Sequence, residues 1–320
     1  MEKNMLRVAE IGMGGISGAH APVWMNMEDV ELVAICDIRP EQMERDEYKD
    51  IRKYTDFEEM LANEEIDILD ITLPTFLHVE YSIKAMERGI NVICEKPISL
   101  DPAEVQKVYD AAAKNNVKFM IAHVLRFWDE YVLLKEIYDT GKYGKLLSGS
   151  MERIGQIPRW SWDDWMRDES RSGLVPFDLH IHDLDFLVYA FGSPKSYTSY
   201  RSKRPEQDYF CVTYQFEDFF VNTQASWYAS PYPFRANFRF QFEKAVVANE
   251  GGLVIYEAET GKKLKVSPDA YGDSAVINLP TTDAYANEIH YFADCVRRDV
   301  FPDRVKASEL EEVVKILRSI

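Results

Sequence analysis

Side chains suited to proton transfer recur at helical spacing late in the chain, where Asp178, His182, Asp185 and Tyr189 stand three or four positions apart. At 100° per residue they fall within an arc of about 60°. Asp178 and His182 can touch on a helix, and an imidazole held by a carboxylate is a good general base near neutral pH. The alternative is a salt-linked helix edge. His180 lies about 160° away on the same helix, and we expect it to be structural.

A glycine-rich turn near the start of the chain predicts a dinucleotide site. Gly12 and Gly14 open the pattern G-x-G-x-x-S, which ends at Ser17. The first glycine permits a tight turn, the second lets the backbone approach a pyrophosphate, and the last position needs a small residue. Asp37 ends the next apolar run, where a carboxylate accepts ribose hydroxyls and repels a 2′-phosphate. We therefore expect NAD to be preferred over NADP, although not exclusively because Arg39 is nearby. A purely structural turn and a helix cap at Asp37 are the alternatives.

Lys96 is the third candidate, between Glu95 and Pro97 directly after the apolar run 91–94. Ligands of open α/β sheets lie at the carboxyl ends of the strands. A lysine desolvated there, beside a nicotinamide ring, can hold or relay the proton of a substrate hydroxyl. A surface lysine paired with Glu95 is the alternative.

The elements that must position these residues alternate between strand and helix in the first 124 residues. Strands of a parallel sheet with helical crossovers are predicted from this alternation, the strands at 6–11, 30–36, 66–73, 91–94 and 118–122 and the helices at 79–88 and 102–115. Glu10 is unusual because it stands inside an apolar strand that such a sheet buries on both faces. It must be paired, protonated or close to a cofactor.

The pattern changes after residue 124, which predicts a Rossmann domain at 1–124 and a second domain at 125–320. Strand patterns dominate from about 145 to 266, and alternation in 238–242 is typical of an antiparallel sheet with one wet face. Helices are expected at 127–140, 175–191, 285–298 and 307–320. The fold class expected is α/β, a doubly wound parallel sheet plus an α+β domain with an open, mostly antiparallel sheet. The C-terminal helix is expected to pack back on the first domain. Few helices are left to cover the second sheet, so we expect a homodimer or homotetramer formed through it.

Composition excludes several classes of protein. The 320 residues carry 54 acidic and 37 basic side chains, a net charge of −17, which disfavours binding to nucleic acid or to an anionic membrane. No run approaches 18 apolar residues. The four cysteines lack the spacing of metal ligands, so no metal site is expected and the thiols are expected to be reduced. With no leader-like segment at its start, the chain is expected to be cytoplasmic.

Four motifs together resemble one known family. They are Gly12-Met13-Gly14-Gly15-Ile16-Ser17-Gly18-Ala19-His20, Leu73-Pro74-Thr75-Phe76-Leu77-His78, Glu95-Lys96-Pro97, and Asp178-x-x-x-His182-x-x-Asp185 preceded by Ser172-Gly173. In this combination the chain resembles the glucose–fructose oxidoreductase, inositol dehydrogenase and rhizopine-catabolism (Gfo/Idh/MocA) family, nearly end to end. The resemblance implies hydride transfer between a nicotinamide cofactor, here NAD, and a sugar or cyclitol carbon.

The resemblance also assigns site residues. It implies Lys96, Asp178 and His182 as the catalytic residues. The cofactor would be bound by Gly12, Gly14, Gly15, Ile16, Asp37, Ile38, Leu73, Pro74, His78, Glu95 and Lys96. Substrate contacts would come from Arg126, Trp165, Asp178 and His182. Two positions depart from the family pattern, namely Glu130 near an expected proline and His180 in place of a small residue.

Two other functions stay open. The same catalytic set would serve a lyase or glycosidase that oxidises a ring carbon transiently, eliminates a neighbouring group and regenerates NAD. A non-catalytic, NAD-sensing regulator is the third possibility, although such a protein needs no proton-transfer residues. Accumulation of NADH with a free sugar, against cleavage of a glycoside with catalytic NAD, separates the first two.

Overall fold

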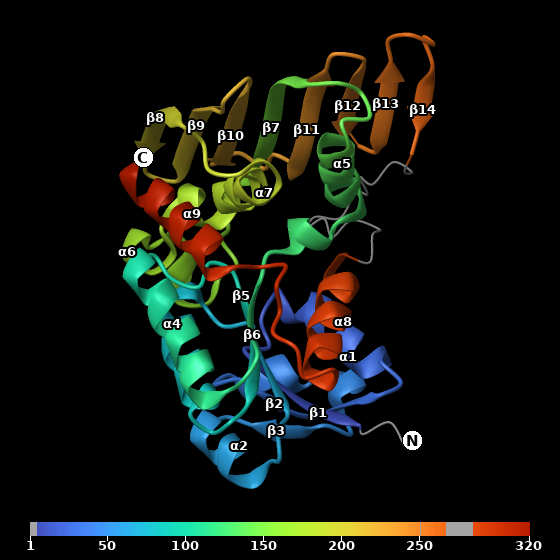
Figure 1. The fold of residues 1–320 in the computed structure, drawn as a ribbon. Coiled ribbons are helices and arrows are strands. Elements are labelled where there is room, and N and C mark those ends of the chain that lie inside the picture. The colour runs from blue at the N-terminus through green and yellow to red at the C-terminus, as the bar shows by residue number, and fades with distance from the viewer. Residues whose placement is uncertain (1–4, 250, 267–283) are drawn as a thin grey trace. The chain divides into compact units, whose positions relative to one another are not determined.

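The computed structural model describes residues 5–249, 251–266 and 284–320 (Figure 1). The chain divides into two compact units at Val124 and Leu125. Helix α8 (Ala284–Arg297) and the part of α9 (Ala307–Ser319) up to Val314 belong to the first unit. Each unit is described by itself.

A six-stranded parallel sheet forms the first unit, in the order β3-β2-β1-β4-β5-β6. Its strands are β1 (Leu6–Ile11), β2 (Val30–Cys36), β3 (Arg52–Tyr54), β4 (Ile68–Ile71), β5 (Asn91–Glu95) and β6 (Phe119–Ala122). The crossover helices are α1 (Ser17–Asn26), α2 (Phe57–Asn63), α3 (His78–Met86) and α4 (Pro102–Asn115). They cover both faces of the sheet (Figure 1), which is why its central strands are almost wholly buried. The predicted doubly wound sheet is confirmed.

Local sequence explains where the helices begin and end. Asp101 caps α4, its side chain accepting a hydrogen bond from the backbone N–H of Ala103 at 3.0 Å, and Pro102 follows in the first turn. Asn116 ends the same helix in the left-handed conformation. The first unit also recruits α8 from far along the chain, and Arg297 on α8 pairs with Asp29 at 2.7 Å.

The second unit is built on an eight-stranded sheet in the order β14-β13-β12-β11-β7-β10-β9-β8. Its strands are β7 (Leu146–Gln156), β8 (Ser196–Arg204), β9 (Gln207–Gln215), β10 (Phe220–Tyr228), β11 (Arg235–Phe242), β12 (Ala245–Asn249), β13 (Leu253–Glu257) and β14 (Lys263–Lys265). Neighbouring strands are antiparallel except β7 and β10, which are parallel. The predicted open, mostly antiparallel sheet is therefore confirmed.

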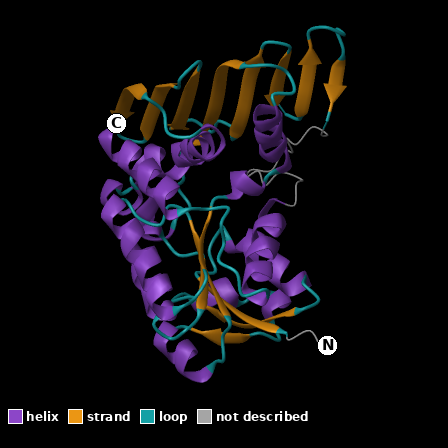
Figure 2. Ribbon diagram, in the orientation of Figure 1, coloured by secondary structure: helices purple, strands orange, loops and turns teal. Residues whose placement is uncertain are grey.

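Helices α5 (Asp129–Thr140) and α7 (Ile181–Phe191) cover one face of this sheet (Figure 2). Aromatic edge-to-face contacts fill the space between, for example Tyr131 against Phe238 and Phe191 against Phe219. Among the described residues no helix covers the opposite face (Figure 2). A hollow of about 440 Å³ lies on the sheet and is lined by side chains including Ser150, Glu152, Asn222 and Arg239.

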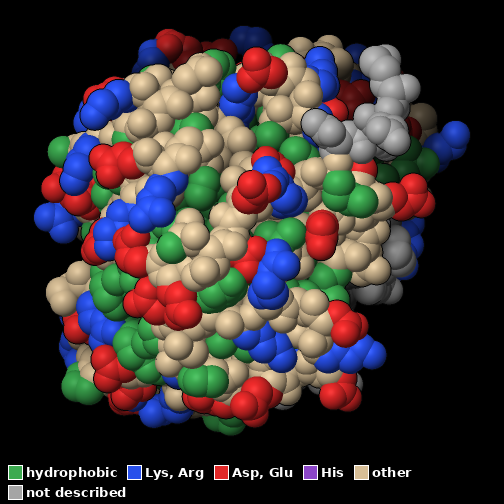
Figure 3. All heavy atoms as spheres, turned by 90° about the horizontal axis from the view of Figure 1, so that it is seen from below, with side chains coloured by type: hydrophobic (Ala, Val, Ile, Leu, Met, Phe, Trp, Pro, Cys, Tyr) green, Lys and Arg blue, Asp and Glu red, His purple; other side chains and the backbone are tan. Residues whose placement is uncertain are grey.

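Two expectations from the composition, on membrane spans and on basic surface, can be compared with the structure. Among the described residues no helix is both long and apolar enough to span a membrane. On the face drawn in Figure 3, acidic and basic side chains are interspersed, and that face carries no extended basic track.

Candidate active site

The glycine turn leaves the end of β1 in a conformation that only glycine suits. Gly12 has φ of +95°, and a Cβ added there would stand 2.8 Å from the carbonyl carbon and oxygen of Thr72. A Cβ on Gly14 would meet nothing within 4 Å, so the space over this residue is open. Ser17 is buried and its hydroxyl donates to the Gly14 carbonyl at 2.8 Å. The Ser17 hydroxyl thus stabilises the turn, and the free space over Gly14 leaves room for the close approach of a pyrophosphate.

Asp37 faces this turn from the end of β2. Its Oδ2 accepts a hydrogen bond from the backbone N–H of Met13 at 2.9 Å, and its Oδ1 accepts from the N–H of Arg39 at 2.8 Å. These two bonds fix the carboxylate, and each oxygen keeps a lone pair for a ribose hydroxyl. The Arg39 guanidinium stands 3.6 Å from Oδ1. The neighbouring Ile38 is 62% exposed, at the surface beside this carboxylate.

The loops that follow β4 and β5 are joined by one imidazole. His78 is buried, its Nδ1 2.7 Å from the Pro97 carbonyl oxygen and its Nε2 2.7 Å from that of Leu73. The ring therefore lies between the loop of the predicted cofactor residues Leu73 and Pro74 and the loop that carries Lys96, and as a neutral imidazole it donates to a carbonyl of one of them. Lys96 itself is half-buried at the carboxyl end of β5, where the sequence predicted it.

A buried polar network beneath these loops accounts for Glu10. On β1 it stands in register with Asp70 of β4, and both side chains are fully buried. The Thr72 hydroxyl lies 3.3 Å from Glu10 Oε1. Burial, reinforced by the negative charge of Asp70, raises the pKa of Glu10 well above its ordinary value, which favours the neutral carboxyl. Asp70 Oδ2 accepts from the Trp24 indole at 2.7 Å and lies 2.9 Å from His20 Nδ1.

In the second unit, the predicted proton-transfer helix begins with a π turn. Residues Pro176–His180 form this turn and α7 follows without a break, so a regular helical wheel does not apply before Ile181. Asp178 and His182 are both half-buried. Asp185, which was predicted to share their edge, is fully buried.

Arg126 is the partner of Asp185. Its Nε and Nη2 donate to the two carboxylate oxygens at 2.9 and 2.7 Å, and the guanidinium lies 4.7 Å from the ring centroid of Tyr189. Arg126 is itself wholly buried. The pair fixes the turn after Val124 to helix α7, and a contact between Arg126 and a substrate stays a prediction.

His180 lies against the sheet, as expected for a structural residue. Its Nε2 is 2.8 Å from the Tyr214 hydroxyl, and its ring stacks on that of Tyr214 with a centroid distance of 5.8 Å. Burial, aided by the nearby Arg153 guanidinium, lowers the pKa of His180 to about 3. Arg153 pairs with Asp183 at 2.9 Å, a second buried ion pair under α7.

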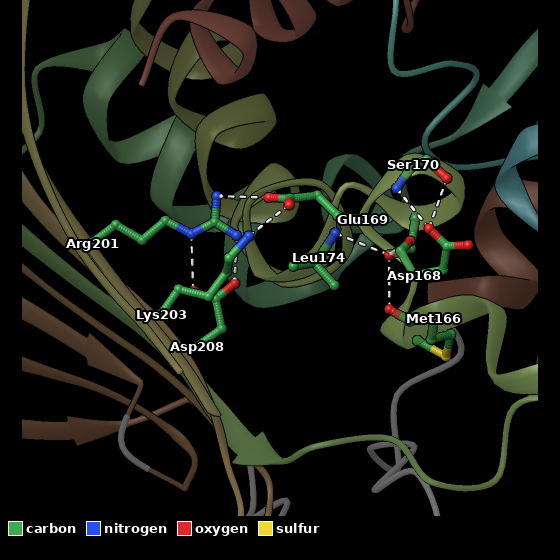
Figure 4. A network of polar contacts seen from close by, with 9 residues as sticks. Met166, Asp168, Glu169, Ser170, Leu174, Arg201, Lys203 and Asp208 are labelled. Atoms are coloured by element: carbon green, nitrogen blue, oxygen red, sulfur yellow. Dashed lines mark hydrogen bonds and ion pairs between the residues drawn. The ribbon is translucent and has the colours of Figure 1, made fainter. Parts of the chain in front are cut away.

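Trp165 is half-buried in the 3₁₀ segment Trp162–Arg167, beside the exposed Trp160 and Trp162. The short helix that follows, Glu169–Ser172, is tied to strands β8 and β9 (Figure 4). There Glu169 pairs with Lys203 at 2.6 Å and lies 3.6 Å from Arg201, which binds Asp208 through two bonds. The tryptophan-bearing segment is therefore anchored to the sheet.

Sequence reasoning missed the partners of these residues more than the residues themselves. The pairing of Arg126 with Asp185 and that of His20 with Asp70 join positions 59 and 50 apart. A signal for the second did exist, because Asp70, like Glu10, interrupts an apolar strand. Among the described residues no group of three or more histidine, cysteine or acidic side chains could hold a metal ion.

Two family models match this chain. The model described as an oxidoreductase family with an NAD-binding Rossmann fold matches residues 6–123, and the model of the GFO/IDH/MocA C-terminal domain matches residues 131–248. The protein therefore belongs to the Gfo/Idh/MocA oxidoreductase family, and its first unit is an NAD-binding Rossmann domain.

Individual relatives differ in the reactions for which they are named. D-glucoside 3-dehydrogenase of Escherichia coli is 28% identical over 197 residues, 61% of this chain and 56% of that protein. Inositol 2-dehydrogenase of Salmonella typhimurium is 30% identical over 189 residues, 57% and 53% of the two chains. The 2,7-anhydro-N-acetylneuraminate hydratase of Mediterraneibacter gnavus is 28% identical over 184 residues, 58% and 49%. The chain spans about half the length of the curated relatives it matches.

The whole fold matches a solved structure. Myo-inositol 2-dehydrogenase from Lactobacillus plantarum superposes with a TM-score of 0.80 at 24% identity, covering 98% of this chain and 96% of that one. This likeness establishes the fold of both units.

Proposed function

We propose that this protein is an NAD-dependent dehydrogenase that oxidises a secondary hydroxyl of a sugar or an inositol, or reduces the corresponding ketone. The observation that carries the proposal is the glycine turn with Asp37 fixed opposite it, on a chain whose sequence also offers Lys96, Asp178 and His182 as candidates for proton transfer. The names of the glucoside and inositol dehydrogenases support the substrate class.

The residues of the first unit fit the cofactor. The open space over Gly14 would receive the pyrophosphate, and Asp37 would bind the adenosine ribose. When bound, NAD supplies the acceptor for the hydride that leaves the carbinol carbon. His78 and the loops it joins hold Lys96 at the carboxyl end of the sheet, where a nicotinamide ring is bound in this fold.

The remaining task is to remove the hydroxyl proton. As the hydride leaves, the carbinol O–H bond breaks and the carbonyl forms, so one proton must pass to a base. We assign that proton to Lys96 and His182, with Asp178 holding the imidazole in the tautomer that accepts it. Asp185 is committed to Arg126 and takes no part in this transfer.

The test is a panel of sugars, inositols and glycosides with NAD, followed by absorbance of NADH. At least one free polyol should reduce NAD in proportion to the ketone formed. If no member of the panel reduces NAD although NAD binds, the dehydrogenase assignment is wrong.

A redox-assisted lyase or glycosidase is the second candidate, favoured by the relative named as a hydratase. There a ring carbon is oxidised transiently, the neighbouring C–H bond loses its proton, a group is eliminated and NAD is regenerated. Cleavage of a glycoside with NAD in catalytic amount and no accumulation of NADH would establish this reaction instead.

We further propose a homodimer or homotetramer formed through the second sheet, acting in the cytoplasm. The uncovered sheet face supports the assembly. The four cysteines are free thiols, which supports a reducing compartment.

A further inference from the structure

A line of buried ionisable side chains runs through the first unit and ends at the predicted catalytic lysine. Glu10, Asp70 and Glu95 lie on β1, β4 and β5, and His20 lies on α1. The exposed fraction is 0% for Glu10, His20 and Asp70 and 6% for Glu95. So many ionisable groups withdrawn from water require mutual compensation.

The contacts form a continuous chain. Asp70 Oδ2 lies 2.9 Å from His20 Nδ1, and His20 Nε2 lies 3.3 Å from Glu95 Oε1. The other oxygen of the same carboxylate, Glu95 Oε2, accepts the backbone N–H of Lys96 at 3.0 Å. The imidazole therefore lies within ion-pair distance of the carboxylate that accepts the backbone N–H of Lys96, without a hydrogen bond from Nε2.

The two flanking carboxylates favour the charged form of His20. A neutral imidazole has one N–H and would turn a lone pair toward one of its two carboxylates. Burial disfavours the imidazolium, but Asp70 and Glu95 outweigh that effect and raise the pKa of His20 well above its ordinary value. Burial raises the pKa of Glu10 on β1, which favours its neutral form, and the Tyr285 ring of α8 lies 5.7 Å from the imidazole between ring centroids. One imidazolium thus stands between two carboxylates.

We propose that His20 is a positioning residue for proton transfer at Lys96, acting by holding the Glu95 carboxylate against the backbone of Lys96. The proposal rests on the dehydrogenase function proposed above. A buried ionic cluster is weak evidence for a gain in stability over apolar packing. The series of contacts from Asp70 through His20 and Glu95 reaches the backbone of Lys96, and this position indicates a role in the site. The positive charge of the imidazolium partly neutralises that of the Glu95 carboxylate. A partly neutralised carboxylate stabilises a neighbouring ammonium less than a fully charged one does.

Loss of the positive charge at His20 should therefore shift the pH profile of kcat in a defined direction. With His20→Gln or Asp70→Asn, the Glu95 carboxylate that accepts the Lys96 N–H is less neutralised, and more negative charge in a site favours the protonated form of an amine. We expect kcat for polyol oxidation to fall about 10–100-fold, as for residues that orient a catalytic group from behind. The acid limb of the pH profile should move to higher pH, while KM for NAD changes less than threefold. Glu95→Gln should move that limb in the opposite direction.

Trp24→Phe is the matched control. It removes a hydrogen bond to the same oxygen of Asp70 and some buried volume, without altering a charge. It should lower the melting temperature and leave the pH profile in place. If it moves the profile as His20→Gln does, the effect is structural and the proposal is wrong.

A second measurement needs no substrate. In the wild-type protein, ¹⁵N signals of His20 should be those of an imidazolium from pH 6 to pH 8, and in Asp70→Asn they should become neutral within that range. Neutral signals in the wild type, or unchanged kcat and pH profile in folded His20→Gln and Asp70→Asn, overturn the proposal but leave the dehydrogenase function intact. If the wild type oxidises no polyol at all, the proposed function fails, and the role of His20 in proton transfer fails with it.

Discussion

His180 should make the second unit sensitive to acid. The imidazole is buried and neutral, with its pKa lowered to about 3 from an ordinary 6.5. The folded state binds this proton more weakly than the unfolded state does. The contribution of His180 to the free energy of unfolding is therefore fully present above pH 6.5 and is lost as the pH falls from 6.5 toward 3. A pH of 5 lies 1.5 units below the pKa of 6.5 in the unfolded state. At about 1.4 kcal/mol per unit, the free energy of unfolding is therefore lower by about 2 kcal/mol at pH 5.

His180→Gln isolates this contribution. Glutamine can still bond the Tyr214 hydroxyl but does not titrate. Urea unfolding at pH 7.5 and pH 5.0, followed by tryptophan fluorescence, reports mainly on the second unit because five of the six tryptophans follow Leu125. The wild type should lose about 2 kcal/mol more than His180→Gln between the two pH values.

A control and a refuting result are available. His290→Gln changes an exposed histidine and should keep the pH dependence of the wild type. Equal losses in the wild type and in His180→Gln would show that His180 is not held neutral by burial.

Further expectations concern the site and the assembly. Lys96→Met and His182→Gln should each lower turnover about 10²–10⁴-fold with little change in NAD affinity measured by calorimetry; full activity of either would remove it from the catalytic set. Asp37→Ala should lower the ratio of kcat/KM for NAD to that for NADP at least tenfold, and an unchanged ratio would contradict the role given to this carboxylate. Arg126→Met should cost about 3–5 kcal/mol because it leaves Asp185 buried without its cation, and Arg126→Met with Asp185→Asn should recover part of that in urea unfolding. Sedimentation at micromolar concentration should give a dimer or tetramer, and a monomer would count against assembly through the second sheet.

What the sequence could predict was set by local patterns. The spacing from Gly12 to Asp37 follows from one strand–turn–helix–strand unit, so both residues stand where the pattern placed them. Apolar runs alternating with helical patterns were enough to predict the first sheet, and the alternation of apolar and polar residues within strands was enough to predict the second. These features depend on neighbours in the chain.

What it could not predict depends on distant neighbours. The π turn over Pro176–His180 changes the hydrogen-bond register, and no residue type in the segment specifies that change. The spacing placed Asp185 on the proton-transfer edge, but in the structure it pairs with Arg126, from the turn after Val124. Glu10 could be recognised as anomalous, but its raised pKa comes from burial and from Asp70, which strand pairing brings beside it.

The central pairing of β7 has a consequence for how the chain acquires its structure during synthesis. Ser148 of β7 pairs with Phe220 of β10, 72 positions later, and Met151 pairs with Phe238 of β11. The strand at the middle of the second sheet therefore leaves the ribosome long before either partner, and neither of its edges can be paired until then. Such long-range closure makes folding slow and exposes β7 to association with other chains. The nascent protein should therefore depend on chaperones most between the emergence of β7 and that of β11.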